Sequence, residues 1–372
     1  MAVFEVNMYK HMFTQCFVAH GKEVMSRRRE RDMSISRRNF LKVAGGTAGV
    51  LALAGCNGGN TDAPASDDGG EGDASQAGGE LISVGIINND PNESGYRTAN
   101  DKDMKETFTE ENGFAAEFAY SMKNEEQIQS AQQFIQNGVK YLLVSAADTA
   151  GWDTPLQDAQ AAGTQTILFD RVVDADESLY VAAVVSDMDA EGETAVNWLT
   201  EQGLDEYNII HIQGVMGSSA QVGRTGALNK AVEANDNWAL VTQQAADWDA
   251  ATAQQITQSV IDAGTPFNVI YAENDDMAKG AVAALDAAGI THGKDGDVII
   301  MGFDHNTWAL EEVMAGRWNY DGQCNPYQAA TILDIINKLE AGEEITEKTI
   351  IMEEGYADCE TVTQEYIDEN GI

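Results

Sequence analysis

Short apolar segments rich in β-branched residues alternate along most of the chain with longer segments of helical period. Segments of the first kind lie at residues 81–88, 115–120, 141–145, 166–170 and 180–186, and then at 207–213, 239–244, 269–272 and 298–303. Between two of them, residues 125–136 place Ile128, Ala131 and Phe134 on one helical face. This alternation predicts an α/β protein whose parallel sheets carry helices on both faces.

Two successive sets of strands predict two lobes. From residue 56 onward the chain has 317 residues, more than the ~250 to 300 at which a single core stops growing. We therefore expect two doubly wound parallel-sheet lobes, with the chain crossing between them near 184–187, 320–324 and 349–355 as a three-strand hinge. The expected N-lobe comprises residues 81–185 and 325–346, and the C-lobe with the hinge return comprises residues 186–324 and 347–372.

The first 55 residues predict an export signal. The arginine pair 37–38 precedes a weakly apolar run, residues 43–54, that is too short to span a bilayer. The run ends in Leu-Ala-Gly before Cys56, which resembles a lipoprotein cleavage box. Together with the twin arginine, this indicates a folded-export (Tat) lipoprotein lipidated at Cys56. A Sec signal with a chance arginine pair and a chance cysteine is the alternative, and Met33 is the expected translation start.

Residues 56–80 are expected to form a disordered acidic tether. From residue 57 onward they contain seven glycines and six acidic residues, but no aromatic or branched aliphatic side chain. Such a segment buries too little apolar surface to offset the entropy of ordering. The folded body should then lie outside the cytoplasm, at the cell surface or in the periplasm, attached to the membrane only through the lipid on Cys56.

The charge of the chain argues against nucleic acid as a partner. Residues 1–55 hold nine of the 22 Lys and Arg and four of the 61 Asp and Glu, which leaves a net charge of -44 from Cys56 onward. Binding to phosphate backbones requires a basic surface that displaces counterions. The 43% of hydrophobic residues excludes disorder for most of the chain.

Polar and aromatic side chains collect where the predicted strands end, which is where open α/β sheets bind ligands. The first set of strands is followed by Asn89, Ser94, Tyr96, Arg97, Ser145, Asp148, Trp152, Asp170 and Arg171, and the second by Gln213, Arg224, Asp247, Trp248, Asn274, Asp275 and Asp304. Only four arginines follow Cys56, and all but Arg317 lie at these positions. Such a concentration favours a binding role over scattered surface roles.

These residue types suit a sugar. The planar donor fork of arginine, with aspartate and asparagine, matches vicinal hydroxyls through paired hydrogen bonds. Flat faces of Tyr96, Trp152 and Trp248 can cover the C–H patches of a sugar ring. Other readings stay open, since Asp170 and Arg171 can form a structural ion pair and Trp248 can pack between the lobes. Asp187 is better explained as a helix cap.

Several motifs then occur in a recognisable order. They are Ser94-Gly95-Tyr96-Arg97, Gly151-Trp152, Leu168-Phe169-Asp170-Arg171, Ile212-Gln213-Gly214, Tyr271-Ala272-Glu273-Asn274-Asp275-Asp276-Met277 and Gly302-Phe303-Asp304. With these motifs, residues 81–353 resemble periplasmic sugar-binding proteins of ABC transporters, of the type I fold. More narrowly, they are similar to the galactofuranose-binding branch of the ribose/galactose-binding family, although that branch more often has Trp at the position of Tyr96.

The resemblance implies which residues contact the sugar. Carried over by position, the contacts are Tyr96, Arg97, Asp170, Arg171, Arg224, Trp248, Asn274 and Asp304. Further candidates are Ser94, Ser145, Trp152, Gln213, Asp275 and Cys324. Many ribose-type relatives place Gln before Asn-Pro at the hinge where this chain has Cys324, and the loss of that amide argues against ribose.

The function that follows is capture of a monosaccharide, a hexose such as galactofuranose or galactose, and its delivery to an ABC permease. Catalysis and a cofactor are not required, and a monomer is expected. A sensor that presents its closed form to a chemoreceptor or histidine kinase is the alternative. An exported sugar-modifying enzyme has the carboxylates it needs, but no nucleophile or metal arrangement accompanies them.

Cysteine and histidine add two expectations. Cys324 and Cys359 either form a disulfide, worth about 4 kcal/mol in the chain-entropy model, or remain two thiols. No metal site is expected, because His211, His292 and His305 have neither the spacing nor the cysteine partners of zinc ligands.

Overall fold

The computed structural model describes residues 80–372. The predicted signal region, the predicted lipidation site Cys56 and all of the expected tether except Glu80 lie outside the described residues. Within the part of the chain that is described, no helix has both the length and the apolar character needed to cross a membrane.

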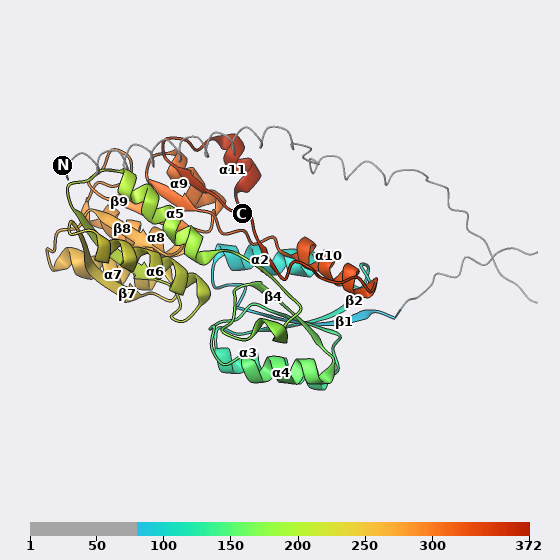
Figure 1. Cartoon of the computed structure of the whole chain (residues 1–372). Helices are drawn as coiled ribbons and strands as arrows, with labels where there is room; N and C mark the ends of the chain where they lie inside the picture. The colour runs from blue at the N-terminus through green and yellow to red at the C-terminus, as the bar shows by residue number, and fades with distance from the viewer. Residues whose placement is uncertain (1–79) are drawn as a thin grey trace, which may run out of the picture. The chain divides into compact units, whose positions relative to one another are not determined.

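The first lobe is built on a six-stranded parallel sheet. Its strands follow the order β2-β1-β3-β4-β5-β11, the doubly wound arrangement that the sequence predicts. They are β1 (Ile82–Asn88), β2 (Phe114–Tyr120), β3 (Tyr141–Val144), β4 (Gln165–Asp170), β5 (Ala182–Val185) and β11 (Thr349–Ile351). Helices α2 (Gly95–Thr107) and α10 (Ala329–Glu340) cover one face, and α3 (Asn124–Gln136) and α4 (Asp153–Ala162) cover the other (Figure 1).

The second lobe repeats this plan. Its sheet has the order β7-β6-β8-β9-β10-β12, in which only β12 is antiparallel to its neighbour. The strands are β6 (Tyr207–Gln213), β7 (Trp238–Ala245), β8 (Val269–Ala272), β9 (Ile299–Phe303), β10 (Tyr320–Gly322) and β12 (Tyr356–Asp358). Helices α5 (Met188–Glu201) and α6 (Ser219–Ala234) pack on one face, and α7 (Ala250–Asp262), α8 (Asp275–Ala288) and α9 (Thr307–Met314) on the other, with α11 (Gln364–Asn370) against α9.

Burial explains why these segments form these elements. Strand β3 reads Tyr-Leu-Leu-Val, and all four side chains are buried because helices cover both faces of the sheet. Hydroxyl and carboxylate side chains cap the starts of several helices: the Ser94 hydroxyl accepts from the Arg97 amide at α2. The Asp187 carboxylate accepts from the Ala190 amide at α5, which confirms the helix-cap interpretation. The predicted two-lobed α/β fold is confirmed.

Three segments connect the lobes: residues 186–187 after β5, 323–326 after β10 and 352–355 after β11. Because β11 pairs with β5, residues 349–351 extend the sheet of the first lobe, whereas the expected C-lobe and hinge return began at 347. The return therefore starts after Ile351. Residues 320–322, expected to cross between the lobes, instead form β10 of the second sheet.

The lobes touch directly. The Gly95 amide lies 3.4 Å from a carboxylate oxygen of Asp276, and the Thr149 amide donates to the Gly217 carbonyl at 3.1 Å. A Cβ on Gly95 would lie 1.7 Å from the Asn306 side chain, so this contact depends on the absence of a side chain. The structure is thus a closed arrangement of the two lobes.

Candidate ligand-binding site between the lobes

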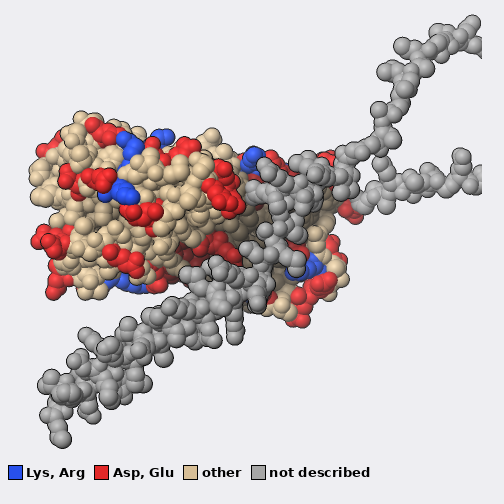
Figure 2. Space-filling view, turned by 90° about the horizontal axis from the view of Figure 1, so that it is seen from above, with Lys and Arg blue, Asp and Glu red and all other residues tan. Residues whose placement is uncertain are grey.

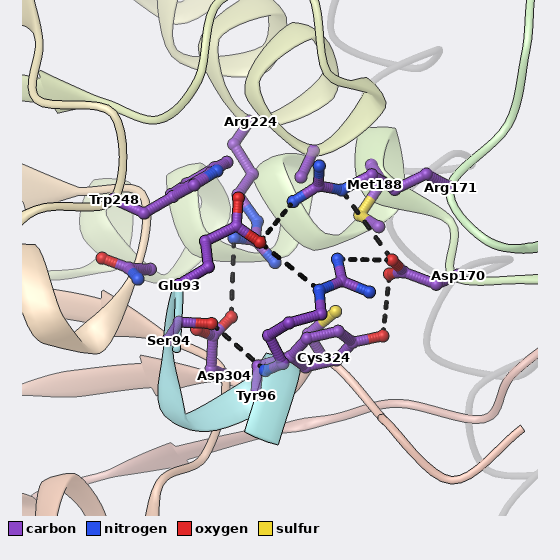
Figure 3. A pocket seen from close by; sticks show the side chains of 13 residues that line it. Glu93, Ser94, Tyr96, Asp170, Arg171, Met188, Arg224, Trp248, Asp304 and Cys324 are labelled. Carbon is purple, nitrogen blue, oxygen red and sulfur yellow. Dashed lines mark hydrogen bonds and ion pairs between the residues drawn. The ribbon is translucent and has the colours of Figure 1, made fainter. Parts of the chain in front are cut away.

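A cavity of about 310 Å³ lies between the lobes. It is lined by the eight predicted sugar contacts, Tyr96, Arg97, Asp170, Arg171, Arg224, Trp248, Asn274 and Asp304, by the further candidates Ser94 and Cys324, and by Glu93, Met188 and Ala220. Figure 3 shows the guanidinium groups and carboxylates of both lobes turned toward the same space. The structure thus brings together three of the four arginines that follow Cys56.

Arg97 organises the wall formed by the first lobe. It lies in the first turn of α2 and is 1% exposed. Its Nη2 donates to Asp170 at 2.8 Å, and its Nη1 donates to Asn88 at 2.7 Å. The Nε lies 3.3 Å from Glu93, one turn earlier. Every nitrogen of this guanidinium is therefore engaged by the protein, and its position is fixed without a ligand.

Asp170 is the carboxylate at the centre of that wall. It ends β4 with a φ of 60°, a left-handed conformation that non-glycine residues rarely adopt. Its carboxylate accepts hydrogen bonds from Tyr96 and Ser145, each at 2.7 Å. Burial favours the neutral acid, but the charges of Arg97 and Arg171 outweigh it and lower the pKa of Asp170. Asp170 is therefore ionised.

Arg171 and Glu93 face the cavity with unused polar atoms. Arg171 lies 3.6 Å from Glu93 through Nη2 and 3.8 Å from Asp170 through Nε. Its Nη1 has no hydrogen-bond partner, and neither does Oε1 of Glu93, although both atoms are buried. Donor and acceptor are therefore both available on this side.

Arg224 organises the wall of the second lobe. It projects from α6 and donates to one oxygen of Glu191 on α5, through Nε at 2.8 Å and Nη2 at 2.6 Å. Its Nη1 donates to the backbone carbonyl of Glu273 and lies 3.8 Å from Asp304. The guanidinium also lies over the ring of Phe303, 4.6 Å from its centroid. These contacts hold Arg224 at the edge of the cavity.

Asp304 and Asn274 complete the polar part of this wall. Asp304 follows β9 with a φ of 116°. Burial raises the pKa of Asp304 well above its usual value, because Arg224 opposes the effect only in part and Asp276 and Asp321 reinforce it. Asn274 caps α8 through its side-chain oxygen, which accepts from the Met277 amide at 2.9 Å, and its Nδ2 is left without a partner.

Trp248 supplies an apolar face from the second lobe. It has a φ of 66°, and its ring lies against Gly214, where a Cβ would come within 1.8 Å of a ring carbon. Glycine is therefore required at 214 for the ring to lie there. The Arg171 guanidinium of the other lobe lies 5.9 Å from the ring centroid, and the indole nitrogen has no hydrogen-bond partner.

Four of the candidate residues do not line the cavity. Ser145, Gln213 and Asp275 lie behind its walls, where they hydrogen-bond to Asp170, Thr225 and Asn306 respectively. Trp152 is 0% exposed in the first lobe's core, and its indole nitrogen donates to Asn124 and to the Asp148 carbonyl. The expectation that Trp152 covers the ligand is corrected: as the residue before α4, it turns back onto the sheet.

Sequence reasoning did not single out Glu93, Met188 or Ala220. Glu93 had a usable signal, because it precedes the helix cap Ser94 and lies four residues before Arg97, one helical turn away. Met188 and Ala220 are apolar residues at the starts of α5 and α6, and nothing in their local sequence distinguishes them from core residues.

The cysteine alternatives are decided by the structure. Cys324 and Cys359 are free, so the disulfide that the sequence left open is not formed. Cys324 is buried beside the cavity, and burial together with Glu191 and Glu354 raises the pKa of its thiol. The thiol is therefore protonated and neutral.

Known proteins are similar to this chain in sequence and in fold. Residues 84–344 match the periplasmic binding protein domain. The galactofuranose-binding protein YtfQ of Escherichia coli is 28% identical over 69% of this chain and 81% of its own length, and the fructose import binding protein FruE of Bifidobacterium longum is 28% identical over 78% and 85%.

Solved structures agree with that result. A galactofuranose-binding protein superposes with a TM-score of 0.72 at 26% identity, over 78% of this chain and 98% of that one. The arabinose-binding component of an ABC transporter from Shewanella, bound to arabinofuranose, gives a TM-score of 0.71 at 26% identity, over 77% and 95%. The chain therefore belongs to the periplasmic binding protein domain family, as its motifs predict.

Proposed function

We propose that this protein captures a monosaccharide, a hexose such as galactofuranose or galactose, between its two lobes and delivers it to an ABC permease. The family assignment supports the general role, since the similar proteins are named as sugar-binding components of importers. None of these relatives is named as an enzyme, which is consistent with binding and release of an unchanged sugar.

The observation that carries the proposal is the set of unused polar atoms around the cavity. Arg171 Nη1, Trp248 Nε1 and Asn274 Nδ2 are donors, Glu93 Oε1 is an acceptor, and all four are buried without partners. A buried polar group without a partner costs about 1 to 3 kcal/mol. A polyol that supplies acceptors and donors to both lobes would remove that cost and stabilise the closed form.

The side chains that line the cavity suit a sugar ring. Rings of Tyr96 and Trp248 come from opposite lobes and offer apolar faces to C–H groups. The two arginines of the first lobe hold carboxylates in place, so their remaining donors keep fixed directions.

We also infer that the protein is exported folded, lipidated at Cys56 and monomeric at the extracytoplasmic membrane surface. The arginine pair 37–38, the short apolar run and the Leu-Ala-Gly-Cys sequence support this part. The acidic surface, seen in Figure 2 as carboxylates spread over the visible face, supports docking through the lipid only. Mass spectrometry of the membrane fraction, with and without Cys56→Ala, tests it by looking for diacylglycerol on residue 56.

A thermal-shift screen tests the sugar. The purified protein is heated with pentoses and hexoses that populate furanose and pyranose rings. A sugar at 100 times its Kd adds about 2.7 kcal/mol to the unfolding free energy, which corresponds to a rise of about 4 °C in Tm for a body of this size. Absence of any shift across the panel would contradict the proposal. Arg171→Ala should lose the shift, and Arg317→Ala, which changes an exposed arginine, should keep it.

A further inference from the structure

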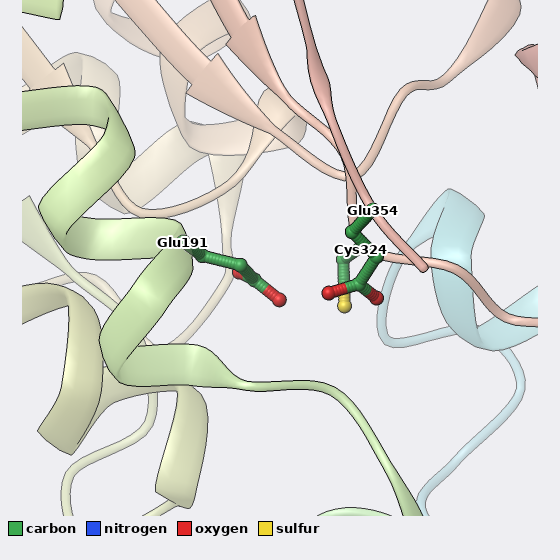
Figure 4. Close-up of side chains that lie close together, drawn as sticks. All are labelled: Glu191, Cys324 and Glu354. Atoms are coloured by element: carbon green, nitrogen blue, oxygen red, sulfur yellow. The ribbon is translucent and has the colours of Figure 1, made fainter. Parts of the chain in front are cut away.

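Three acidic side chains meet in the hinge, behind the sugar cavity. They are Glu191 in α5, Cys324 in the second crossing segment and Glu354 in the third, and one ligand atom from each lies within 4.8 Å of the others. Glu191 is 7% exposed and Cys324 3%. Figure 4 shows the Glu191 carboxylate pointing across the hinge toward the thiol and the Glu354 carboxylate.

Each carboxylate is held by one oxygen, and this leaves the other oxygen for a further partner. One oxygen of Glu191 accepts both donors from Arg224, while Oε1 is buried without a hydrogen-bond partner. Oε1 of Glu354 accepts from the Ser186 hydroxyl at 2.5 Å and from the Asn325 amide at 2.7 Å. Metal-binding carboxylates are oriented in this way by outer hydrogen bonds.

The donor atoms of the cluster suit a divalent cation. Two carboxyls and a thiol face each other, and Arg224 is the one basic side chain paired with any of them among the described residues. A divalent ion bound to two carboxylates and a thiolate would, together with Arg224, balance the charge of the cluster. A thiolate beside carboxylates suits a borderline metal such as Zn²⁺ better than Ca²⁺ or Mg²⁺, which prefer oxygen alone.

A route from solvent reaches the cluster. A groove of about 550 Å³ runs along the hinge and is lined by Glu191, Glu354 and residues of the β10 and β11 ends. It lies apart from the sugar cavity, whose lining includes Cys324 but neither of the two glutamates. Water from this groove can fill the fourth position of a tetrahedral ion.

We propose that Glu191, Cys324 and Glu354 form a hinge site for one zinc ion. The ligands come from the C-lobe helix that follows the first crossing and from the other two crossings, so the ion joins parts of the chain that move relative to each other when the lobes open. Binding displaces the thiol proton and any carboxyl protons, which are released to solvent.

Zinc and cobalt titrations of the purified, reduced protein test the site without any sugar. We expect one Zn²⁺ per chain by calorimetry, and with Co²⁺ the near-ultraviolet charge-transfer absorption of a cobalt–thiolate bond. Cys324→Ser should abolish that absorption, and both Cys324→Ser and Glu354→Gln should weaken zinc binding by at least about tenfold. The matched controls are Cys359→Ser and Glu353→Gln, which change the other described cysteine and the exposed neighbour of Glu354.

The possible results of these titrations either support the zinc site or overturn it. Loss in the two hinge variants with retention in the two controls supports the site. No saturable zinc binding by the unaltered protein, or a cobalt–thiolate absorption that persists in Cys324→Ser, overturns it. Thermal melting of each variant shows whether it is folded, and since the two hinge substitutions are independent, failure of one to fold leaves the other as the test.

Discussion

The two walls of the sugar cavity differ in how far arginine side chains compensate their buried carboxyl groups. In the first lobe, two arginines face two carboxylates, Asp170 and Glu93, and the pKa of Asp170 is lowered. In the second lobe, one arginine serves both Glu191 and Asp304, and the pKa values of both acids are raised. One wall is charge-balanced, and the other has more acid than its single cation can hold ionised.

This difference teaches how the two lobes contribute to binding. The first wall is fixed by its own ion pairs, so it presents preformed donors to a ligand. The second wall depends on Arg224, because no other basic side chain among the described residues pairs with Glu191 or Asp304. We therefore expect loss of Arg224 to damage the fold and loss of Arg171 to damage mainly the affinity for sugar.

Arg224→Ala should have the largest effect. Removing one partner of a buried ion pair leaves an uncompensated acid, and this typically costs about 3 to 5 kcal/mol of unfolding free energy. Denaturant unfolding monitored by circular dichroism measures the loss. Arg317→Ala is the control, because Arg317 is about half exposed and its ion pairs are worth about 0 to 1 kcal/mol. Equal losses of unfolding free energy in the two variants would contradict the inferred dependence of the second wall on Arg224.

Arg171→Ala should weaken sugar binding by about 2 to 4 kcal/mol while changing stability little. Asp170 keeps Arg97, Tyr96 and Ser145 as partners, so the wall survives. Calorimetry with the sugar found in the screen measures the change. Unchanged affinity would take Arg171 out of the binding site.

Gly214→Ala should cost about 1 to 3 kcal/mol in sugar affinity, because a methyl group there overlaps the Trp248 ring and forces it to move. Gly226→Ala is the matched control, since a Cβ at that position meets no atom within 4 Å. Fluorescence of the tryptophans during sugar titration gives the affinities. Equal affinity in the two variants would show that the Trp248 ring is not needed where the structure places it.

The smallest expected effects concern how the unfolding free energy depends on pH, and this dependence has opposite signs in the two walls. The lowered pKa of Asp170 gives stability above the unfolded value of about 3.9, which is lost as the pH falls through the folded pKa. The raised pKa of Asp304 has the opposite sign, because the folded protein keeps a proton that the unfolded chain releases, so stability falls as the pH rises above about 4.

Asparagine at either position should flatten only its own limb of the pH profile. Asp170→Asn should reduce the loss of unfolding free energy on the acid side, and Asp304→Asn should reduce the decline on the alkaline side. Denaturant unfolding at a series of pH values measures both limbs. A change in the same limb for both variants would contradict the contrast between the walls.

Much of the fold was predictable because it depends on local pattern. The apolar strands of the two sheets and the Asp187 cap follow from side chains that act within a few residues. The partner of β11 was not predictable, since a three-residue strand pairs wherever a sheet edge is free. The orientation of Trp152 was missed for a related reason: its position after β3 suits a ligand contact, but the chain turns it into the core.

By itself, the sequence determined the two-lobed α/β architecture and the strand ends that carry the chemistry, because hydrophobic period and strand order place the carboxyl ends of parallel strands together. Only the tertiary structure decided which atoms remain without partners in the cavity, and that Glu191, Cys324 and Glu354 meet in the hinge. Those outcomes depend on distances between segments far apart in the chain, which no local pattern encodes.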